Sequence, residues 1–220
     1  LPKMIDILAA RGLRLGWARF VGDDPPLLET TLRESFASGD VVFSFGGIGA
    51  TPDDVTRQCA AAAAGVLLVR HAEAVALIEA RFGESAYPNR VLMADLPQGA
   101  RLIPNPVNQI PGFSLHQHHF LPGFPNMAWP MAEWVLDTHY RHLFRAQPES
   151  ERAVMVYDVA ESALIPIMRE LLAAFPGIKL ASLPSTTNSG EIELGVRGEG
   201  ADVARAFDWL RARLDALGVR

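Results

Sequence analysis

VVFSFGGIGATPDDVT, which runs from Val41 to Thr56, is the stretch of sequence that decides the fold. Its first five residues have the length and apolar character of a buried strand, and the glycines Gly46, Gly47 and Gly49 follow directly. Glycines let backbone N–H groups approach a phosphate closely, and the helical pattern that follows would point the positive end of its dipole at the same spot. The stretch therefore predicts a binding site for a small phosphate-bearing ligand.

The glycines also have a simpler interpretation, as turn residues that supply positive φ angles between a strand and a helix. Their density directly before a helix favours phosphate or pyrophosphate binding over a plain turn. The stretch lacks the lysine of a Walker A loop, and its glycine spacing differs from that of the dinucleotide-binding fingerprint. The predicted phosphate site is therefore neither a Walker A loop nor a dinucleotide-binding fingerprint.

The residues that follow the glycines, Thr51-Pro52-Asp53-Asp54, have the composition of a capping box, with Thr51 as N-cap and Asp54 at N3. Capping alone would account for Asp54. A carboxylate beside a phosphate is electrostatically unfavourable, however, unless a divalent cation such as Mg²⁺ binds the oxygens of both. Two roles for Asp54 stay open, as a cap only and as a cap that also binds a metal.

Apolar spacing along the chain predicts an alternation of helices and strands. Up to residue 146, helices are expected over residues 3–11, 29–38, 53–64, 72–82 and 127–144, and strands over 13–21, 41–45, 66–69, 101–103 and 113–120. The continuous apolar run at 41–45 is typical of a sheet that is covered on both faces. We predict an α/β fold for residues 1–146, with a mostly parallel sheet and helices on both faces.

A second domain is predicted over residues 151–220. The polar segment Ala146-Gln147-Pro148-Glu149-Ser150 has the composition of a linker, and the periodic pattern starts again after it. Strands are expected over 153–157, 178–182 and 192–196, and helices over 161–175 and 201–217. This order describes a small β-α-β-β-α unit.

Four motifs occur in an order that resembles the molybdopterin-binding fold. They are the glycine stretch read as GGxGxTxDDxT, Val21-Gly22-Asp23-Asp24, LPxGA at 96–100 followed by Asn105-Pro106, and LPGFP at 121–125. The Mog and gephyrin-type proteins of molybdenum cofactor synthesis share this fold with competence/damage-inducible protein A, and the expected C-terminal unit resembles the second domain of the latter. Such proteins usually begin with a strand and a GDE-type turn, whereas this sequence begins at Leu1-Pro2-Lys3 and enters a helical pattern at once.

The resemblance implies a pocket for molybdopterin or an adenine nucleotide. It assigns the ligand contacts to a set of loop residues, namely Gly46, Gly47, Ile48, Gly49, Thr51, Asn105, Pro122 and Gly123. It assigns the catalytic carboxylates to Asp23 and Asp54, with Mg²⁺ at Asp54. Asp23 is also an ordinary turn residue or helix N-cap. If both carboxylates follow strands of one sheet, they would share a crevice at its carboxyl edge.

Two functions follow from this resemblance. One is Mg²⁺-dependent hydrolysis of a pyrophosphate bond in a substrate like ADP-ribose or FAD, or related nucleotidyl chemistry. The other is a non-catalytic molybdopterin-binding module of molybdenum cofactor metabolism. Many relatives have Thr where Ile48 stands, so one side-chain hydroxyl contact is absent from this sequence.

Composition limits the partners. A formal charge of −5 gives no basic field of the kind that nonspecific nucleic-acid binding requires, and no apolar run reaches the roughly 20 residues that cross a bilayer. We expect neither a nucleic-acid nor a membrane partner. The single cysteine, Cys59, excludes an internal disulfide and suits a reducing compartment, so we expect a cytoplasmic protein.

Two further expectations concern side chains outside the loop. His116, His118 and His119 have no cysteine or carboxylate interleaved at ligand spacing, which favours solvated or half-buried strand histidines over a metal site. The long helical segment 127–144 carries Trp129 and Trp134, whose apolar surface suits a partner subunit, and relatives with this fold commonly form dimers or trimers. We therefore expect a homo-oligomer.

Overall fold

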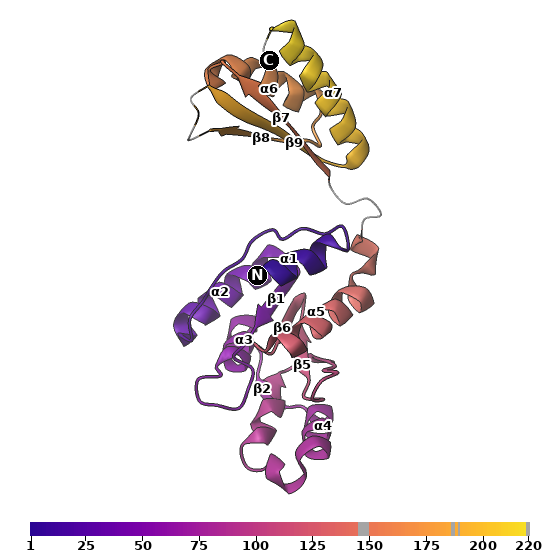
Figure 1. Cartoon of the computed structure of the whole chain (residues 1–220). Helices are drawn as coiled ribbons and strands as arrows, with labels where there is room; N and C mark the ends of the chain where they lie inside the picture. Colours follow the sequence, from indigo (N-terminus) through magenta and orange to yellow (C-terminus); the bar gives the residue numbers. More distant parts are fainter. Residues whose placement is uncertain (145–149, 186–187, 189, 219–220) are drawn as a thin grey trace. The chain divides into compact units, whose positions relative to one another are not determined.

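The computed structural model describes residues 1–144, 150–185, 188 and 190–218 (Figure 1). The chain divides into two compact units, one of Leu1–Met4 with Leu15–Leu143 and the other of Ile5–Arg14 with Phe144–Arg220. The predicted linker at 146–150 lies outside the described residues except for its last position, Ser150. The domain boundaries at 146 and 151 therefore stay a prediction.

The first unit contains a four-stranded mixed sheet with the order β1-β6-β5-β4. Its strands are β1 (Val42–Phe45), β4 (Arg101–Ile103), β5 (Gly112–Leu115) and β6 (His118–Leu121). β1 and β6 are parallel, whereas β5 runs antiparallel to both of its neighbours. The predicted α/β class is confirmed. The sheet is mixed rather than mostly parallel, because the short turn between β5 and β6 can join only antiparallel strands.

The first unit also contains a separate two-stranded antiparallel sheet formed by β2 (Leu68–Arg70) and β3 (Asp95–Pro97). The helices of this part of the chain are α1 (Pro2–Ala9), α2 (Pro25–Ser38), α3 (Thr56–Ala64), α4 (Ala72–Phe82) and α5 (Pro125–His139), with 3₁₀ turns at η1 (Gly83–Ala86), η2 (Arg90–Ala94) and η3 (Arg141–Leu143). The side chain of Asp24 caps α2 by accepting a hydrogen bond from the Leu27 N–H at 3.0 Å. Gly65, at φ 68°, ends α3. None of the described helices has the length and apolarity needed to cross a bilayer.

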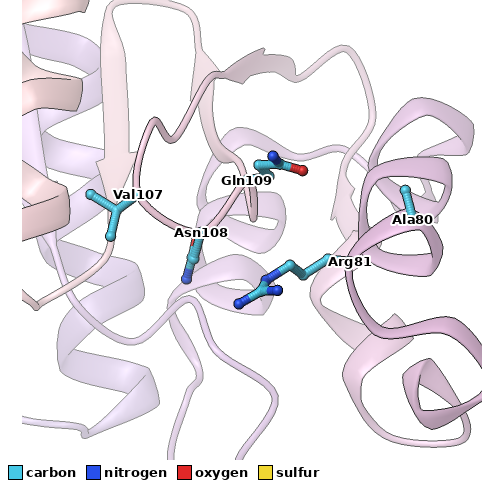
Figure 2. Close-up of a pocket in the computed structure, with 5 residues that line it drawn as sticks. All are labelled: Ala80, Arg81, Val107, Asn108 and Gln109. Carbon is cyan, nitrogen blue, oxygen red and sulfur yellow. The ribbon is translucent and has the colours of Figure 1, made fainter.

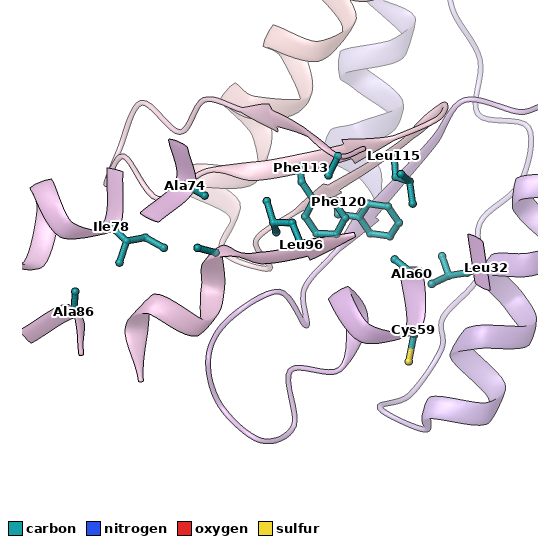
Figure 3. Packing of buried hydrophobic residues seen from close by; sticks show 12 residues of the cluster. Leu32, Cys59, Ala60, Ala74, Ile78, Ala86, Leu96, Phe113, Leu115 and Phe120 are labelled. Carbon is teal, nitrogen blue, oxygen red and sulfur yellow. The ribbon is translucent and has the colours of Figure 1, made fainter. Parts of the chain in front are cut away.

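The core of the first unit forms around two stacked aromatic rings from the hairpin β5–β6 (Figure 3). The ring centroids of Phe113 and Phe120 are 4.5 Å apart, and both side chains are almost completely buried. Leu32 of α2 and Ala60 of α3 belong to the same cluster. Burial of each phenylalanine contributes about 1.5–3 kcal/mol. This packing fixes β6 beneath the helices and thereby positions the ends of the parallel pair.

The predicted strand at 13–21 is wrong, because these residues form an irregular and mostly exposed segment. Phe20 is 90% exposed. The Trp17 side chain is 40% exposed, although its indole N–H donates to the Asp40 carboxylate at 2.9 Å and the Arg19 guanidinium carbon lies 5.3 Å from its ring centroid. Alternating apolar residues are not sufficient for a strand, since backbone groups need a neighbouring strand, and the described residues offer none here.

The second unit has the β-α-β-β-α order expected from the sequence. Its part from Ser150 onward consists of β7 (Ser150–Tyr157), α6 (Glu161–Ala174), β8 (Lys179–Pro184), β9 (Glu191–Gly198) and α7 (Gly200–Ala216). β9 lies between β7 and β8 and is antiparallel to both. Leu164, Leu171 and Leu210 of the helices are buried against Leu194 and Val196 of β9. The unit therefore has a hydrophobic core of its own.

Candidate functional site

The carboxyl ends of β1 and β6 form one edge of the parallel pair. Phe45 lies opposite Leu121 in the register, and the N–H of Gly46 donates to the Leu121 carbonyl at 2.9 Å. A loop leaves each strand at this point: 46–55 leads into α3, and 122–124 leads into α5. In α/β proteins, ligands bind at the carboxyl edge of parallel strands, where such loops meet. This edge is the candidate site.

The two loops touch through a pair of glycines. A Cβ atom added to Gly123 would lie 3.5 Å from the Cα atom of Gly46, which itself has a φ of 97°. The backbone of Gly46 thus has the left-handed conformation that favours glycine, and the contact with Gly123 is between backbones. The structure brings together these two predicted ligand-binding residues, which are 77 positions apart in the sequence.

Gly47 must be glycine for two reasons. Its φ is 68°, and an added Cβ would lie only 2.2 Å from the hydroxyl oxygen of Thr56. Thr56 is the first residue of α3, and it donates its N–H to the Gly47 carbonyl at 3.0 Å and its hydroxyl to the Gly46 carbonyl at 3.2 Å. The first residue of α3 is therefore hydrogen-bonded to both glycines.

The loop offers unpaired backbone donors. Within the described part of the chain, the N–H groups of Gly47, Ile48 and Ala50 donate no hydrogen bond. Neither helix that begins at this edge has a side-chain cap, because the N-cap residues are Val55 for α3 and Phe124 for α5. Unpaired amides near helix N-termini favour an anion electrostatically.

Thr51 and Asp54 form a closed turn ahead of α3. The Asp54 carboxylate oxygen Oδ2 accepts from the Thr51 N–H at 3.0 Å and from the Thr51 hydroxyl, while the Asp54 N–H donates to the Thr51 carbonyl at 2.9 Å. Only one of the two bonds of a capping box is present, because the Asp54 N–H donates to the backbone carbonyl of Thr51 and not to its hydroxyl. The helix begins two residues later, at Thr56. The predicted N-cap position of Thr51 is therefore wrong.

The Asp54 carboxyl is held in its ionised form. Burial raises its pKa, but hydrogen bonds from the Thr51 hydroxyl and from the backbone of Thr51 and Gly49, together with the charge of Arg57, lower it by more. The net pKa of Asp54 lies below its usual value. A carboxylate with a full negative charge thus stands beside the unpaired amides of the loop.

Arg57 is a structural residue of the loop that sequence reasoning missed. Its side chain is buried, and its guanidinium donates to the carbonyls of Gly49 at 2.7 Å, Asp95 at 3.0 Å and Leu92. Burial lowers the Arg57 pKa, an effect that the carboxylates of Asp95 and Asp54 oppose. The one available signal was a charged residue in the first turn of an alanine-rich helix, and nothing in the sequence indicated its three distant acceptors.

Asp23 does not occupy the position expected for it. It lies exposed in a bend before α2, and its neighbour Asp24 is the residue that caps this helix. Since residues 13–21 form no strand, Asp23 does not follow one, and the reason for placing it at the same sheet edge as Asp54 no longer holds. No hydrogen bond joins the two carboxylates to a common partner in the described residues.

The other residues predicted to contact the ligand differ in the groups that they could offer to it. The Ile48 side chain packs against the hydrophobic core, which leaves only its backbone for a ligand. Asn105 is buried, accepts the Val107 N–H at 3.0 Å and contacts the sulfur of Met127 in the first turn of α5 at 3.4 Å. Asn105 therefore anchors its loop to α5, while Pro122 is half-buried where β6 ends.

Two of the three histidines, His118 and His119, are more deeply buried than expected, whereas His116 is exposed. The ring nitrogen Nε2 of His118 is 2.8 Å from the Ser35 hydroxyl, and the His119 ring lies 2.8 Å from the Ser114 hydroxyl and 2.7 Å from that of Tyr140. Burial and neighbouring positive groups lower the pKa to about 4 for His118 and to about 3 for His119. Among the described residues, no group of three or more histidine, cysteine or acidic side chains is arranged to hold a metal ion.

Comparison with known proteins gives a family match. Residues 1–142 match the family model described as "Probable molybdopterin binding domain". A CinA-like protein of Syntrophotalea carbinolica is 33% identical over 190 residues, which cover 81% of this chain and 45% of that protein. A CinA-like protein of Gloeobacter violaceus is 30% identical over 208 residues, covering 90% of this chain and 48% of that protein.

A solved structure agrees with the fold. The crystal structure of the protein CinA from Thermoplasma acidophilum superposes with a TM-score of 0.56 at 28% identity, covering 62% of this chain and 84% of that one.

A protein of Pyrobaculum calidifontis is 34% identical over 159 residues, or 69% of this chain and 61% of the relative. The chain thus spans about half to two thirds of the length of the relatives that it matches.

Proposed function

We propose a function from the premise that this chain belongs to the molybdopterin-binding domain family: its first unit binds the phosphate group of a small ligand at the edge where β1 and β6 end. The observation that carries this proposal is the set of N–H groups of Gly47, Ile48 and Ala50, which donate no hydrogen bond within the described part of the chain. Such amides bind a phosphate without any cationic side chain.

The residues fit a phosphate group in shape as well. Glycines occupy the positions where a side chain would intrude, since a Cβ on Gly47 would strike Thr56 and one on Gly123 would stand over Gly46. The loop is also held in place before a ligand arrives, because Arg57 binds the Gly49 carbonyl. The family description supports molybdopterin as the ligand, and an adenine nucleotide is the alternative that presents the same phosphate chemistry.

Catalysis is the second candidate function, and the ionised carboxylate of Asp54 favours it. Mg²⁺ commonly takes one or two protein carboxylates and completes its coordination with phosphate oxygens and water. Asp54 fits this role together with a bound pyrophosphate. The magnesium ion would supply charge neutralisation at the pyrophosphate, while the chain itself would hold the ligand through the loop amides and keep Asp54 deprotonated through Thr51.

The binding function is tested by calorimetric titration of the full chain with molybdopterin, ADP-ribose, FAD and ATP, each with and without Mg²⁺. Gly123→Val is the test variant, because its Cβ makes only an ordinary contact with Gly46 and the protein should fold. Gly16→Val is the matched control, since Gly16 has an ordinary φ and nothing within 4 Å of its added Cβ. We expect Gly123→Val to weaken phosphate-ligand binding by at least about tenfold, or about 1.4 kcal/mol. Equal affinity in both variants, or no binding of any of the four ligands, would refute the proposal.

The catalytic function is tested with Asp54→Asn against Asp53→Asn, which removes the same charge from the neighbouring exposed position. If Asp54 holds the metal, only Asp54→Asn should lose Mg²⁺-dependent hydrolysis, while the affinity measured without Mg²⁺ stays similar. If Asp54 only closes the turn, Asp54→Asn should cost about 1–2 kcal/mol of stability and leave turnover unchanged. Retained hydrolysis in Asp54→Asn would therefore remove the enzyme hypothesis, and Asp23→Asn tests in the same way whether Asp23 takes part.

The remaining expectations on partners belong to this proposal. A homo-oligomer is supported by the partly exposed Trp134 on α5, and the absence of a nucleic-acid partner by the charge of −5. A cytoplasmic location is supported by the free and buried Cys59.

A further inference from the structure

A pocket of about 280 Å³ lies between the last turn of α4 and the loop that follows Asn105 (Figure 2). It is lined by Ala80, Arg81, Val107, Asn108 and Gln109. None of these residues belongs to the glycine loop, and none stood out in the sequence. This volume lies just below the usual range for ligand sites, about 300–1,000 Å³, so the pocket suits one polar group rather than a whole cofactor.

The pocket carries one positive charge and no negative one. Arg81 is its only ionisable residue, and it forms no ion pair within the described part of the chain. The guanidinium carbon of Arg81 lies 5.9 Å from the ring centroid of Phe82. The charge of Arg81, in the last turn of α4, also stabilises the carboxyl end of that helix through its dipole. This role needs only the charge and leaves the N–H groups of the guanidinium available for a ligand.

The loop opposite Arg81 supplies two side-chain amides. The Asn108 carbonyl oxygen accepts the Ile110 N–H at 3.0 Å, which leaves the amide nitrogen as the free end of that side chain. Figure 2 shows the Arg81 side chain extending from α4 toward Asn108, with Gln109 on the same loop. Both amides and the guanidinium can donate hydrogen bonds, and no lining side chain is an obligate acceptor.

This loop is held in one conformation. Gln109 has a φ of 67°, an uncommon value for a residue with a side chain, and its N–H donates to the Asn105 carbonyl at 3.1 Å. The Asn105 side chain in turn accepts the Val107 N–H at 3.0 Å. The donors are therefore positioned before a ligand arrives, which reduces the entropy lost on binding.

We infer that this pocket binds an oxyanion, the phosphate or carboxylate group of a small molecule, through Arg81 with Asn108 and Gln109 as additional donors. The fork of guanidinium N–H groups matches the two oxygens of such a group. The site is separate from the glycine loop and does not depend on the function proposed for that loop.

The test is a titration of the ¹⁵N-labelled full chain with inorganic phosphate and, separately, with acetate. The backbone amide signal of Gln109 reports this pocket, and that of Gly47 reports the glycine loop. We expect a saturable shift of the Gln109 signal, and an affinity about tenfold lower in Arg81→Gln. Arg81→Lys, which keeps the charge without the fork, should be intermediate. Arg33→Gln removes an exposed arginine of α2 that pairs with Glu29, and it should match the wild type.

A saturable shift of the Gln109 signal with either anion supports the inference. The anion that binds with the higher affinity then shows whether the pocket recognises a phosphate or a carboxylate group. The inference is overturned if neither anion gives a saturable Gln109 shift, or if Arg81→Gln binds as tightly as Arg33→Gln. A shift of the Gly47 signal alone would support the function of the glycine loop and reject this pocket, so the two proposals fail independently.

Discussion

Replacement of Gly47 by alanine should destabilise the first unit beyond the cost of its backbone conformation. Gly65 provides the comparison, because both glycines have a φ of 68° while an added Cβ on Gly65 meets nothing within 4 Å. A side chain in the left-handed region costs about 1–2 kcal/mol, which both variants share. At Gly47 the Cβ would also lie 2.2 Å from the Thr56 hydroxyl oxygen, and such overpacking adds about 1–3 kcal/mol. We therefore expect a total loss of about 2–5 kcal/mol for Gly47→Ala.

The assay is urea unfolding followed by tryptophan fluorescence in a Trp209→Phe background. Trp209 lies in α7 of the second unit, whereas the other three tryptophans lie in the first, so the signal then reports the first unit alone. The free energy of unfolding is compared between Gly47→Ala and Gly65→Ala, each against the same parent.

A double-mutant cycle separates the clash from other causes. Thr56→Ala removes the hydroxyl that Gly47→Ala would strike, at the expense of its hydrogen bond to the Gly46 carbonyl. The two changes should therefore be less destabilising together than the sum of the single effects, by about 1 kcal/mol or more. Equal losses at Gly47 and Gly65, or strict additivity in the cycle, would show that the contact with Thr56 is not the reason for the glycine.

Three further predictions concern Arg57, the buried histidines and the oligomeric state. Arg57→Met leaves the carbonyls that Arg57 binds without a donor, so we expect a loss of at least about 2 kcal/mol by urea unfolding, against about 0.5 kcal/mol or less for Arg33→Met at an exposed ion pair. Because the folded-state pKa values of His118 and His119 are lowered to about 4 and about 3, the unfolded chain binds protons first as pH falls. Their contribution to stability should be complete above about pH 6.5 and should decline toward pH 4, with a shallower decline in His118→Gln in unfolding curves measured across that range. Light scattering at micromolar concentration should give a multiple of the 23.9 kDa chain mass, and a monomer mass would refute the homo-oligomer.

Local sequence signals predicted the elements that depend on local chemistry. The apolar run at 41–45 and the glycines after it correspond to β1 and its turn, and Gly39 and Gly65 end α2 and α3 as helix-terminating residues do. The order of elements in the second unit was also predictable, because each has its own apolar period. Family membership followed from motif order, which needs no knowledge of contacts.

Properties that depend on a distant partner could not be predicted in this way. Residues 13–21 have the composition of a strand but no neighbouring strand among the described residues. Likewise, the depth at which His118 and His119 are buried is determined by the packing of Ser35 and Tyr140 around them, which are far away in sequence.

The sequence by itself determined that a glycine turn follows an apolar strand and precedes a helix, since short-range sterics and periodicity are properties of neighbouring residues. The prediction that this strand is buried on both faces is wrong, because β1 is the last strand of its sheet in the described residues and is only partly buried. Only the tertiary structure decided what this turn can do. The approach of Gly123 to Gly46 arises from pairing β1 with β6 across more than 70 residues. Arg57 holds Gly49 and, through Leu92 and Asp95, ties the loop to a distant part of the chain. The physical reason is that a hydrogen-bond donor becomes a binding group only when the fold leaves it unpaired, and that depends on every segment packed around it.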